Sequence, residues 1–195
     1  MTAIGVLALQ GDVREHARMV REAGATAVPV KRADGLTSLD GLVIPGGEST
    51  TIGKLLRRFG MLEPLRSLVE SGFPVYGTCA GMILLADRIE DAGVDQPSIG
   101  GMNIAVRRNA FGRQRESFEA DVDVPVLGDE PFPAIFIRAP VIEGVGEGVD
   151  ILASVAGERP VAARQGRLLV SSFHPELTDD ARLHRYFVDM VEGRS

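Results

Sequence analysis

Short apolar runs alternate with amphipathic segments along the first half of the chain. Apolar runs that stop at glycine or proline are typical of buried strands, whereas apolar residues three or four positions apart predict helices. Strands alternating with helices favour a parallel sheet with helices on both faces. The expected strands are Ile4–Leu9, Ala27–Val30, Leu42–Pro45 and Pro74–Gly77, and the expected helices are Val13–Ala23, Thr50–Ser71, divided at Gly60 and Pro64, and Ala80–Ile89.

The second half of the chain shows a different pattern, in which short apolar runs are separated by turn residues such as Gln165-Gly166. Such spacing predicts antiparallel strands that follow one another. A final stretch with Leu183, Phe187 and Val191 on one face predicts a closing helix. The expected strands are Ile104–Val106, Phe118–Val122, Ala134–Ile137, Ile151–Val155, Val161–Arg164 and Leu168–Ser172, and the expected helix is Arg182–Val191.

Composition places these elements in one globular α/β domain, residues 1–195. The chain is 45% hydrophobic and 25% charged, which excludes a disordered protein, and its length is that of a single domain. A net charge of −6 argues against sequence-independent binding to nucleic acid. No apolar stretch reaches the length of a membrane helix. The single cysteine excludes an intrachain disulfide and fits a reducing, cytoplasmic location.

That cysteine lies in the segment GTCAG, residues 77–81, between a predicted strand and a predicted helix. The form G-x-C-x-G is the cysteine counterpart of the nucleophile elbow, in which small neighbours let the chain turn sharply and present the nucleophile. The helix N-terminus behind Cys79 favours a thiolate, and the N–H of Ala80 is placed to donate to an oxyanion. The alternative is a buried structural cysteine.

A histidine and a carboxylate follow the predicted strand Leu168–Ser172 in the segment FHPE. Residues two apart in extended chain point the same way, so His174 and Glu176 can reach one site. A nucleophilic cysteine needs a base, and the base needs a carboxylate to fix its tautomer. The alternative is a loop histidine beside a surface glutamate. A metal site is disfavoured, because His16 and His184 do not have the sequence spacing of metal ligands. His16 is expected at the surface or at an interface.

A third candidate loop is PGGESTT, residues 45–51, which follows a predicted strand and precedes a predicted helix. Two glycines before a Ser/Thr cluster can bind an anion through backbone N–H groups. The spacing to the next Gly-Lys pair does not fit a phosphate loop. We expect the N–H of Gly47 to be a second oxyanion donor and Glu48 to hold a substrate ammonium. The alternative is a simple helix cap at Ser49 or Thr50.

Two arginines lie at predicted strand ends, Arg108 in the segment RRN and Arg138 in the segment IRAP. An arginine in such a position can clamp a substrate carboxylate with two parallel hydrogen bonds. Most arginines are solvated surface residues, so a surface role is the alternative for both.

These segments resemble the class I glutamine amidotransferases of the triad type. The broad resemblance is carried by GTCAGM (77–82), FHPEL (173–177) and PGGEST (45–50). A narrower resemblance, to the glutaminase subunits of pyridoxal 5'-phosphate synthases, is carried by GVLALQGDVREH (5–16), PGGESTT (45–51), RRNAFGRQ (107–114) and FIRAP (136–140). The match runs nearly end to end. It implies a single three-layer α/β domain with a mostly parallel central sheet and added antiparallel strands.

The resemblance also implies a role for each matching residue. Cys79 would be the nucleophile, His174 the general base and acid, and Glu176 the carboxylate that orients the histidine. The N–H groups of Gly47 and Ala80 would form the oxyanion hole. Residues that would lie along the bound glutamine are Gly47, Glu48, Ser49, Arg108, Ile137 and Arg138. No metal and no cofactor is implied.

Members of this family release ammonia from L-glutamine and pass it to a separate synthase subunit, with up to twelve copies of each subunit in one assembly. The chain is therefore expected to hydrolyse glutamine through a γ-glutamyl thioester and to supply pyridoxal 5'-phosphate synthesis with ammonia. Three alternatives stay open: a glutaminase that serves another synthase, a free-standing cysteine hydrolase, and a non-catalytic subunit with the same fold.

Overall fold

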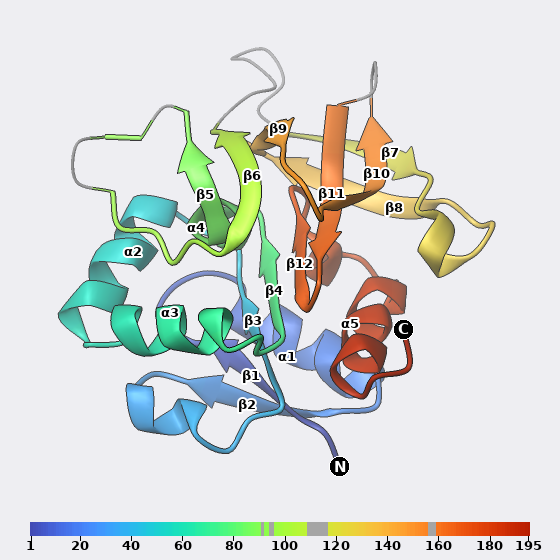
Figure 1. The fold of residues 1–195 in the computed structure, drawn as a ribbon. Helices are drawn as coiled ribbons and strands as arrows, with labels where there is room; N and C mark the ends of the chain where they lie inside the picture. Colours follow the sequence, from blue (N-terminus) through green and yellow to red (C-terminus); the bar gives the residue numbers. More distant parts are fainter. Residues whose placement is uncertain (91, 94–95, 109–116, 156–158) are drawn as a thin grey trace.

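The computed structural model describes residues 1–90, 92–93, 96–108, 117–155 and 159–195. Within these residues, seven strands form a central sheet in the order β10-β11-β12-β4-β3-β1-β2 (Figure 1). The sheet's parallel strands are β1 (Ala3–Leu7), β2 (Thr26–Val30), β3 (Gly41–Ile44), β4 (Val75–Thr78) and β12 (Leu168–Ser171). The antiparallel strands β10 (Asp150–Val155) and β11 (Arg159–Gln165) extend one edge. The predicted mostly parallel sheet with added antiparallel strands is therefore confirmed.

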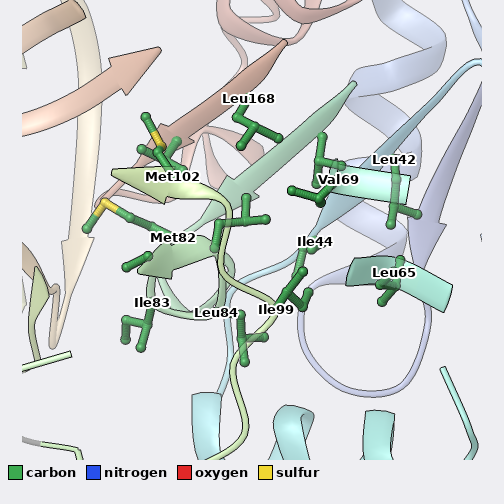
Figure 2. Packing of buried hydrophobic residues seen from close by; sticks show 14 of the residues in the cluster. Leu42, Ile44, Leu65, Val69, Met82, Ile83, Leu84, Ile99, Met102 and Leu168 are labelled. Carbon is green, nitrogen blue, oxygen red and sulfur yellow. The ribbon is translucent and has the colours of Figure 1, made fainter. Parts of the chain in front are cut away.

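Alternating side chains of the parallel strands divide the hydrophobic core between the two faces of this sheet. In β3, Leu42 and Ile44 pack into one core, whereas Val43 between them packs into the other. Figure 2 shows the first core, where α3 and α4 bring Leu65 and Met82 to this face. The helices on this face are α2 (Ser49–Arg58), α3 (Leu62–Glu70) and α4 (Ala80–Leu85). The opposite face is covered by α1 (Val13–Glu22) and α5 (Arg182–Val191), which completes three layers.

Smaller sheets and short helices complete the described part of the chain. One sheet has the order β5-β6-β9 and another pairs β7 with β8. These strands are β5 (Ala86–Ile89), β6 (Met102–Arg107), β7 (Ser117–Val122), β8 (Phe132–Ile137) and β9 (Val141–Val145), and the short 3-10 helices are η1 (Ala33–Leu36), η2 (Pro125–Leu127) and η3 (Pro175–Leu177). Most predicted elements are found with ends within about two residues of those expected.

One predicted helix is wrong in part, and one strand was not predicted. The helix expected over Ala80–Ile89 ends at Leu85, because the next four residues pair with β6 as strand β5. The strand Val141–Val145 was not predicted, and it forms by pairing with β6 from the other side. In both cases a partner strand distant in sequence supplies the backbone hydrogen bonds, which local periodicity does not register.

The long helical stretch is divided as predicted, but at one of the two expected positions. Gly60 lies between α2 and α3 with a φ of 65°, a left-handed conformation that favours glycine. Pro64 instead lies in the first turn of α3, where its missing N–H would have no partner within the helix. The break therefore depends on Gly60, whereas Pro64 is compatible with the first turn of α3.

Candidate functional site

Loops after four parallel strands meet at one edge of the central sheet. They follow β1, β3, β4 and β12, which are neighbours in the parallel part of the sheet. Because parallel strands end at the same edge, residues far apart in sequence converge there. The loops carry Gln10–Asp12, Gly46–Ser49, Cys79 and His174–Glu176. The structure thus brings the three predicted catalytic residues to one place.

The turn at Cys79 has the geometry of a nucleophile elbow. Cys79 has a φ of 48° and a ψ of −101°, which are unusual for a residue with a side chain. A Cβ on Gly77 would lie 2.5 Å from the carbonyl carbon of Gly81, and one on Gly81 would lie 2.2 Å from the carbonyl oxygen of Ile44. Both flanking glycines are therefore required by close backbone contacts, which explains the G-x-C-x-G pattern.

The strained backbone at Cys79 predicts an unusual order of stability for two variants. Both Cys79→Gly and Cys79→Ala lack the thiol, but only glycine accepts the positive φ without a steric cost. We expect Cys79→Gly to exceed Cys79→Ala in free energy of unfolding by about 1 kcal/mol, measured by urea denaturation. Ala17→Gly in α1 is the control, and it should be destabilising. A Cys79→Ala variant more stable than Cys79→Gly would contradict the strained turn.

His174 is fixed by a short hydrogen bond to the carboxylate of Glu176. The distance from His174 Nδ1 to Glu176 Oε1 is 2.7 Å, and both side chains are buried. Since Nδ1 is occupied, Nε2 remains for Cys79. Burial alone would lower the pKa of His174, but the hydrogen bonds to Cys79 and Glu176 and their negative charges raise it to about 10. His174 is therefore an imidazolium near neutral pH, beside the thiol group of Cys79.

Glu176 stays ionised in spite of complete burial. Desolvation raises the pKa of its carboxyl group, but the interactions with His16 and His174 outweigh it and hold the pKa well below its usual range. Asp12 Oδ2 also lies 3.7 Å from His174 Nδ1. Oxygen and nitrogen atoms of Asp12, His174 and Glu176 lie within 4.8 Å of one another, a spacing that would also suit the ligands of a metal ion. The 2.7 Å contact already accounts for the histidine and glutamate as a hydrogen-bonded pair.

The loop after β3 is held from two directions. The backbone N–H of Glu48 donates to Gln10 Oε1 at 2.9 Å, and a Cβ on Gly47, whose φ is 142°, would meet that same oxygen at 2.3 Å. The Glu48 carboxylate accepts from the backbone N–H groups of Thr50 and Thr51. Glu48 is thus the N-cap of α2, so the alternative interpretation, a cap at Ser49 or Thr50, is wrong by one or two positions.

Partial burial raises the pKa of the Glu48 carboxyl group, but these hydrogen bonds outweigh it, and the pKa lies below its usual range. Glu48 is therefore an anion at the rim of a cavity of about 410 Å³. Cys79 and His174 line the cavity, and the carbonyl oxygen of Ile137 lies 4.0 Å from Cys79 Sγ. The lining residues include every predicted glutamine contact: Gly47, Glu48, Ser49, Arg108, Ile137 and Arg138.

The other predicted residues are placed as follows. Arg108 Nη1 donates to Thr50 Oγ1 at 3.4 Å, beside the cap of α2. Arg138 adopts a φ of 42°, so its backbone is held in a conformation that side chains rarely adopt. Ala80 is fully buried at the first position of α4. Residues 109–114 of the RRNAFGRQ segment lie outside the described residues.

Comparison with known proteins gives the family of this chain. The model of the SNO glutamine amidotransferase family matches residues 6–193. The chain belongs to this family. It is thus an enzyme that acts on glutamine. A crystal structure of a glutamine amidotransferase, 50% identical in sequence, covers 97% of this chain and 98% of its own with a TM-score of 0.91.

Relatives of this amidotransferase carry a more specific name. A protein of Parafrankia sp. (strain EAN1pec), named pyridoxal 5'-phosphate synthase subunit PdxT, is 63% identical over 97% of this chain and 93% of its own length. A protein of the same name from Streptomyces avermitilis is 60% identical over 97% of this chain and 94% of its own length. Among the described residues of the amidotransferase, no helix has both the length and the apolar character to cross a membrane.

Sequence reasoning missed one buried part of the amidotransferase site. The prediction that His16 lies at the surface or at an interface is wrong with respect to the surface, because its side chain is fully buried within this chain. His184 of α5 is also fully buried and contacts His16. The signal was present in the helix pattern: His16 precedes the core residues Met19 and Val20 by three and four positions, on the inward face of α1.

Proposed function

We propose that this amidotransferase is the glutaminase subunit of a pyridoxal 5'-phosphate synthase and that it hydrolyses L-glutamine to L-glutamate and ammonia. The observation that carries the reaction is the convergence of Cys79, His174 and Glu176 beside an open cavity. The names of relatives about 60% identical over nearly the full length support the pathway. The catalytic domain is the whole chain, residues 1–195.

In the first half of the reaction, the Cys79 thiolate attacks the side-chain amide carbon and forms a C–S bond. The N–H groups of Gly47 and Ala80 donate to the oxyanion, each contributing about 3 kcal/mol to transition-state stabilisation by analogy with other oxyanion holes. His174, as an imidazolium, gives its proton to the amide nitrogen as the C–N bond breaks. Ammonia leaves, and a γ-glutamyl thioester remains on the cysteine.

In the second half, His174 takes a proton from water, the hydroxide adds to the thioester, and the C–S bond breaks to return the thiolate. Glu176 keeps Nδ1 of the histidine protonated throughout, so Nε2 always faces the reacting atoms. The substrate is held by Glu48, Ser49, Arg108, Ile137 and Arg138, with the carboxylate of Glu48 opposite the substrate ammonium and the arginines opposite the substrate carboxylate.

The partner is a synthase subunit that receives the ammonia, in an assembly of up to twelve copies of each subunit. The reaction needs neither a metal nor a cofactor on this chain. A reducing cytoplasm is the location that suits a single catalytic thiol.

The test is glutamate release from L-glutamine by the purified chain, with and without the purified synthase subunit. We expect release to rise when the synthase subunit is added, and pyridoxal 5'-phosphate to form from glutamine when the synthase substrates are present. Ammonium salt in place of glutamine should support product formation by the synthase subunit alone. Glutamate release that the synthase subunit leaves unchanged, with no pyridoxal 5'-phosphate formed, would reject the pathway and retain the glutaminase.

A further inference from the structure

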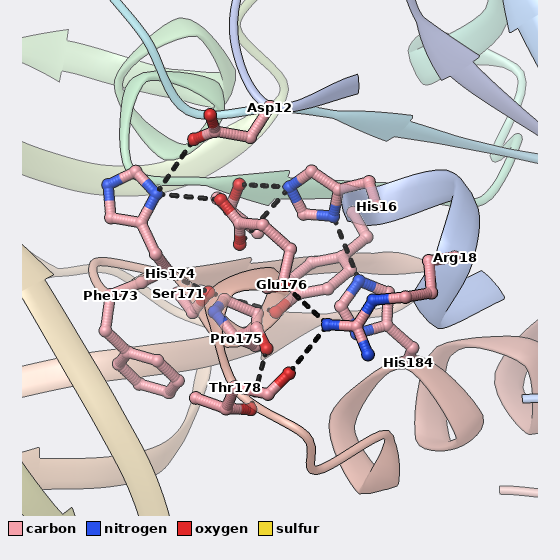
Figure 3. Close-up of polar contacts among 12 residues, drawn as sticks. Asp12, His16, Arg18, Ser171, Phe173, His174, Pro175, Glu176, Thr178 and His184 are labelled. Atoms are coloured by element: carbon pink, nitrogen blue, oxygen red, sulfur yellow. Dashed lines mark hydrogen bonds and ion pairs between the residues drawn. The ribbon is translucent and has the colours of Figure 1, made fainter. Parts of the chain in front are cut away.

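A buried network of polar side chains continues from Glu176 to residues that do not line the cavity (Figure 3). His16 Nε2 lies 3.3 Å from Glu176 Oε2 and 3.1 Å from Thr78 Oγ1. On the other side of the ring, His16 Nδ1 lies 2.9 Å from Nε2 of His184. All four side chains are fully buried. The proposed reaction uses only the Oε1 side of Glu176, so the other members of this network have no assigned role.

The positions of the protons in this network follow from its last member, His184. His184 Nδ1 is buried and has no hydrogen-bond partner among the described residues. If His16 donated from Nδ1, His184 would accept at Nε2, and its own proton would lie on the unpartnered Nδ1. A buried N–H without an acceptor is more costly than a lone pair without a donor. We therefore assign the proton of His184 to Nε2, which donates to His16 Nδ1.

The contacts of His16 with Glu176 and Thr78, at the other end of the network, favour the same assignment. With Nδ1 accepting, His16 carries a proton on Nε2 and directs it at Glu176 Oε2 and Thr78 Oγ1. The opposite tautomer would place a lone pair 3.3 Å from a carboxylate oxygen, which is repulsive. Burial lowers the pKa of His184 to about 3, so this second imidazole is neutral at physiological pH.

From this geometry we propose that His16 is a positioning residue of the glutaminase reaction, which holds the second carboxylate oxygen of Glu176 so that the first faces His174 Nδ1. The terminal torsion of a glutamate is broad, so one hydrogen bond leaves the carboxylate plane free to rotate. Oε2 has no hydrogen-bond partner among the described residues, so its 3.3 Å contact with His16 Nε2 is what restrains that plane. This inference rests on the proposed role of the triad.

The surrounding contacts support the same role. Arg18, on the same helix as His16, donates to the backbone oxygen of Thr178 at 3.0 Å and to that of Glu176 at 3.4 Å. Helix α1 therefore holds the catalytic loop by its backbone and by its carboxylate. His16 does not line the substrate cavity. Its loss should consequently lower kcat and leave the KM for glutamine unchanged.

The kinetic test compares His16→Leu with His16→Gln, assayed with the synthase subunit present. Leucine fills the site without a donor, whereas the amide nitrogen of glutamine reaches the position of Nε2. We expect His16→Leu to lower kcat by about 10-fold to 100-fold at unchanged KM, which is the loss typical of replacing a residue that orients a metal ligand in other enzymes. His16→Gln should recover most of kcat. Equal losses in both variants that track their thermal unfolding temperatures would overturn the positioning role.

A second measurement needs no variant and no activity. Two-bond ¹⁵N–¹H correlation spectra of the wild-type chain at pH 7 report the tautomer of each imidazole. We expect both imidazoles to carry a proton on Nε2 and none on Nδ1, and a proton on Nδ1 of His16 would overturn the inference. A wild-type chain that releases no glutamate, even with the synthase subunit, would instead reject the proposed function, and the spectra would still decide the hydrogen-bond arrangement.

Discussion

Replacing Cys79 with alanine is expected to lower kcat for glutamate release by at least about 10³-fold, because no other group in the described site can form the thioester. Cys79 is the only cysteine of the chain, so no second thiol can substitute for it. Its side chain is buried beneath the cavity, and removal of one sulfur atom leaves the outer surface unchanged. Glutamate release is measured with the synthase subunit present.

The matched variant for this experiment is His174→Asn, which removes the base and leaves the thiol. We expect a loss of similar size, because nucleophile and base act as one unit and their losses do not add. Both variants should still co-elute with the synthase subunit in size-exclusion chromatography, since neither residue contributes much surface. Wild-type turnover in Cys79→Ala would refute the assignment of the nucleophile. Inactivity together with failure to co-elute would indicate misfolding and would call for the crystal structure of the variant.

The second large effect is expected from Gly46→Ala, although residue 46 takes no part in the chemistry. A Cβ at this position would lie 2.5 Å from His174 Cε1 and 3.0 Å from His174 Nδ1, and 3.4 Å from the Cβ of Cys79. The histidine is buried and bonded to Glu176, so it can yield only by leaving its catalytic position. We expect kcat to fall by about 10²-fold, the usual penalty for a displacement of about 1 Å at a reacting group.

Gly35→Ala is the matched control for Gly46→Ala. A Cβ at residue 35 would meet only a methyl group of Val30, at an ordinary contact distance of 3.4 Å. Glutamate release by this variant should equal that of the wild type, and urea denaturation should show that both variants are folded. Wild-type kcat in Gly46→Ala would mean that His174 has room to move, and that the tight packing around its ring is not needed for the reaction.

The agreement between sequence and structure has a simple cause at the triad. Cys79, His174 and Glu176 each follow an apolar run that reads as a buried strand. Once those runs are parallel neighbours in one sheet, their carboxyl ends must meet, so the site follows from order and pattern. The glycines at 77 and 81 were predictable in type for a similar reason, since a sharp turn needs small residues. The close contacts that require them appear only in three dimensions.

The features that the sequence did not predict share another cause, which is an interaction with a partner far away in the sequence. Strands β5 and β9 form because β6 pairs with both, and no local pattern in the sequence predicts that pairing. The capping role of Glu48 depends on how the chain leaves β3, and local preference alone favoured the serine or threonine that follows it. Burial of His16 was visible as a position on the inward face of α1, but the residues that it contacts were not.

The amino-acid sequence by itself predicted the α/β architecture, the sharp turn at Cys79 and the convergence of Cys79, His174 and Glu176, because short-range periodicity and strand-end position indicate them. Only the tertiary structure decided which side chains support that triad. His16 and His184 are 168 positions apart, and they touch because α1 and α5 cover the same face of the sheet. Hydrogen bonds between such distant residues depend on packing angles and burial, which a linear pattern does not contain.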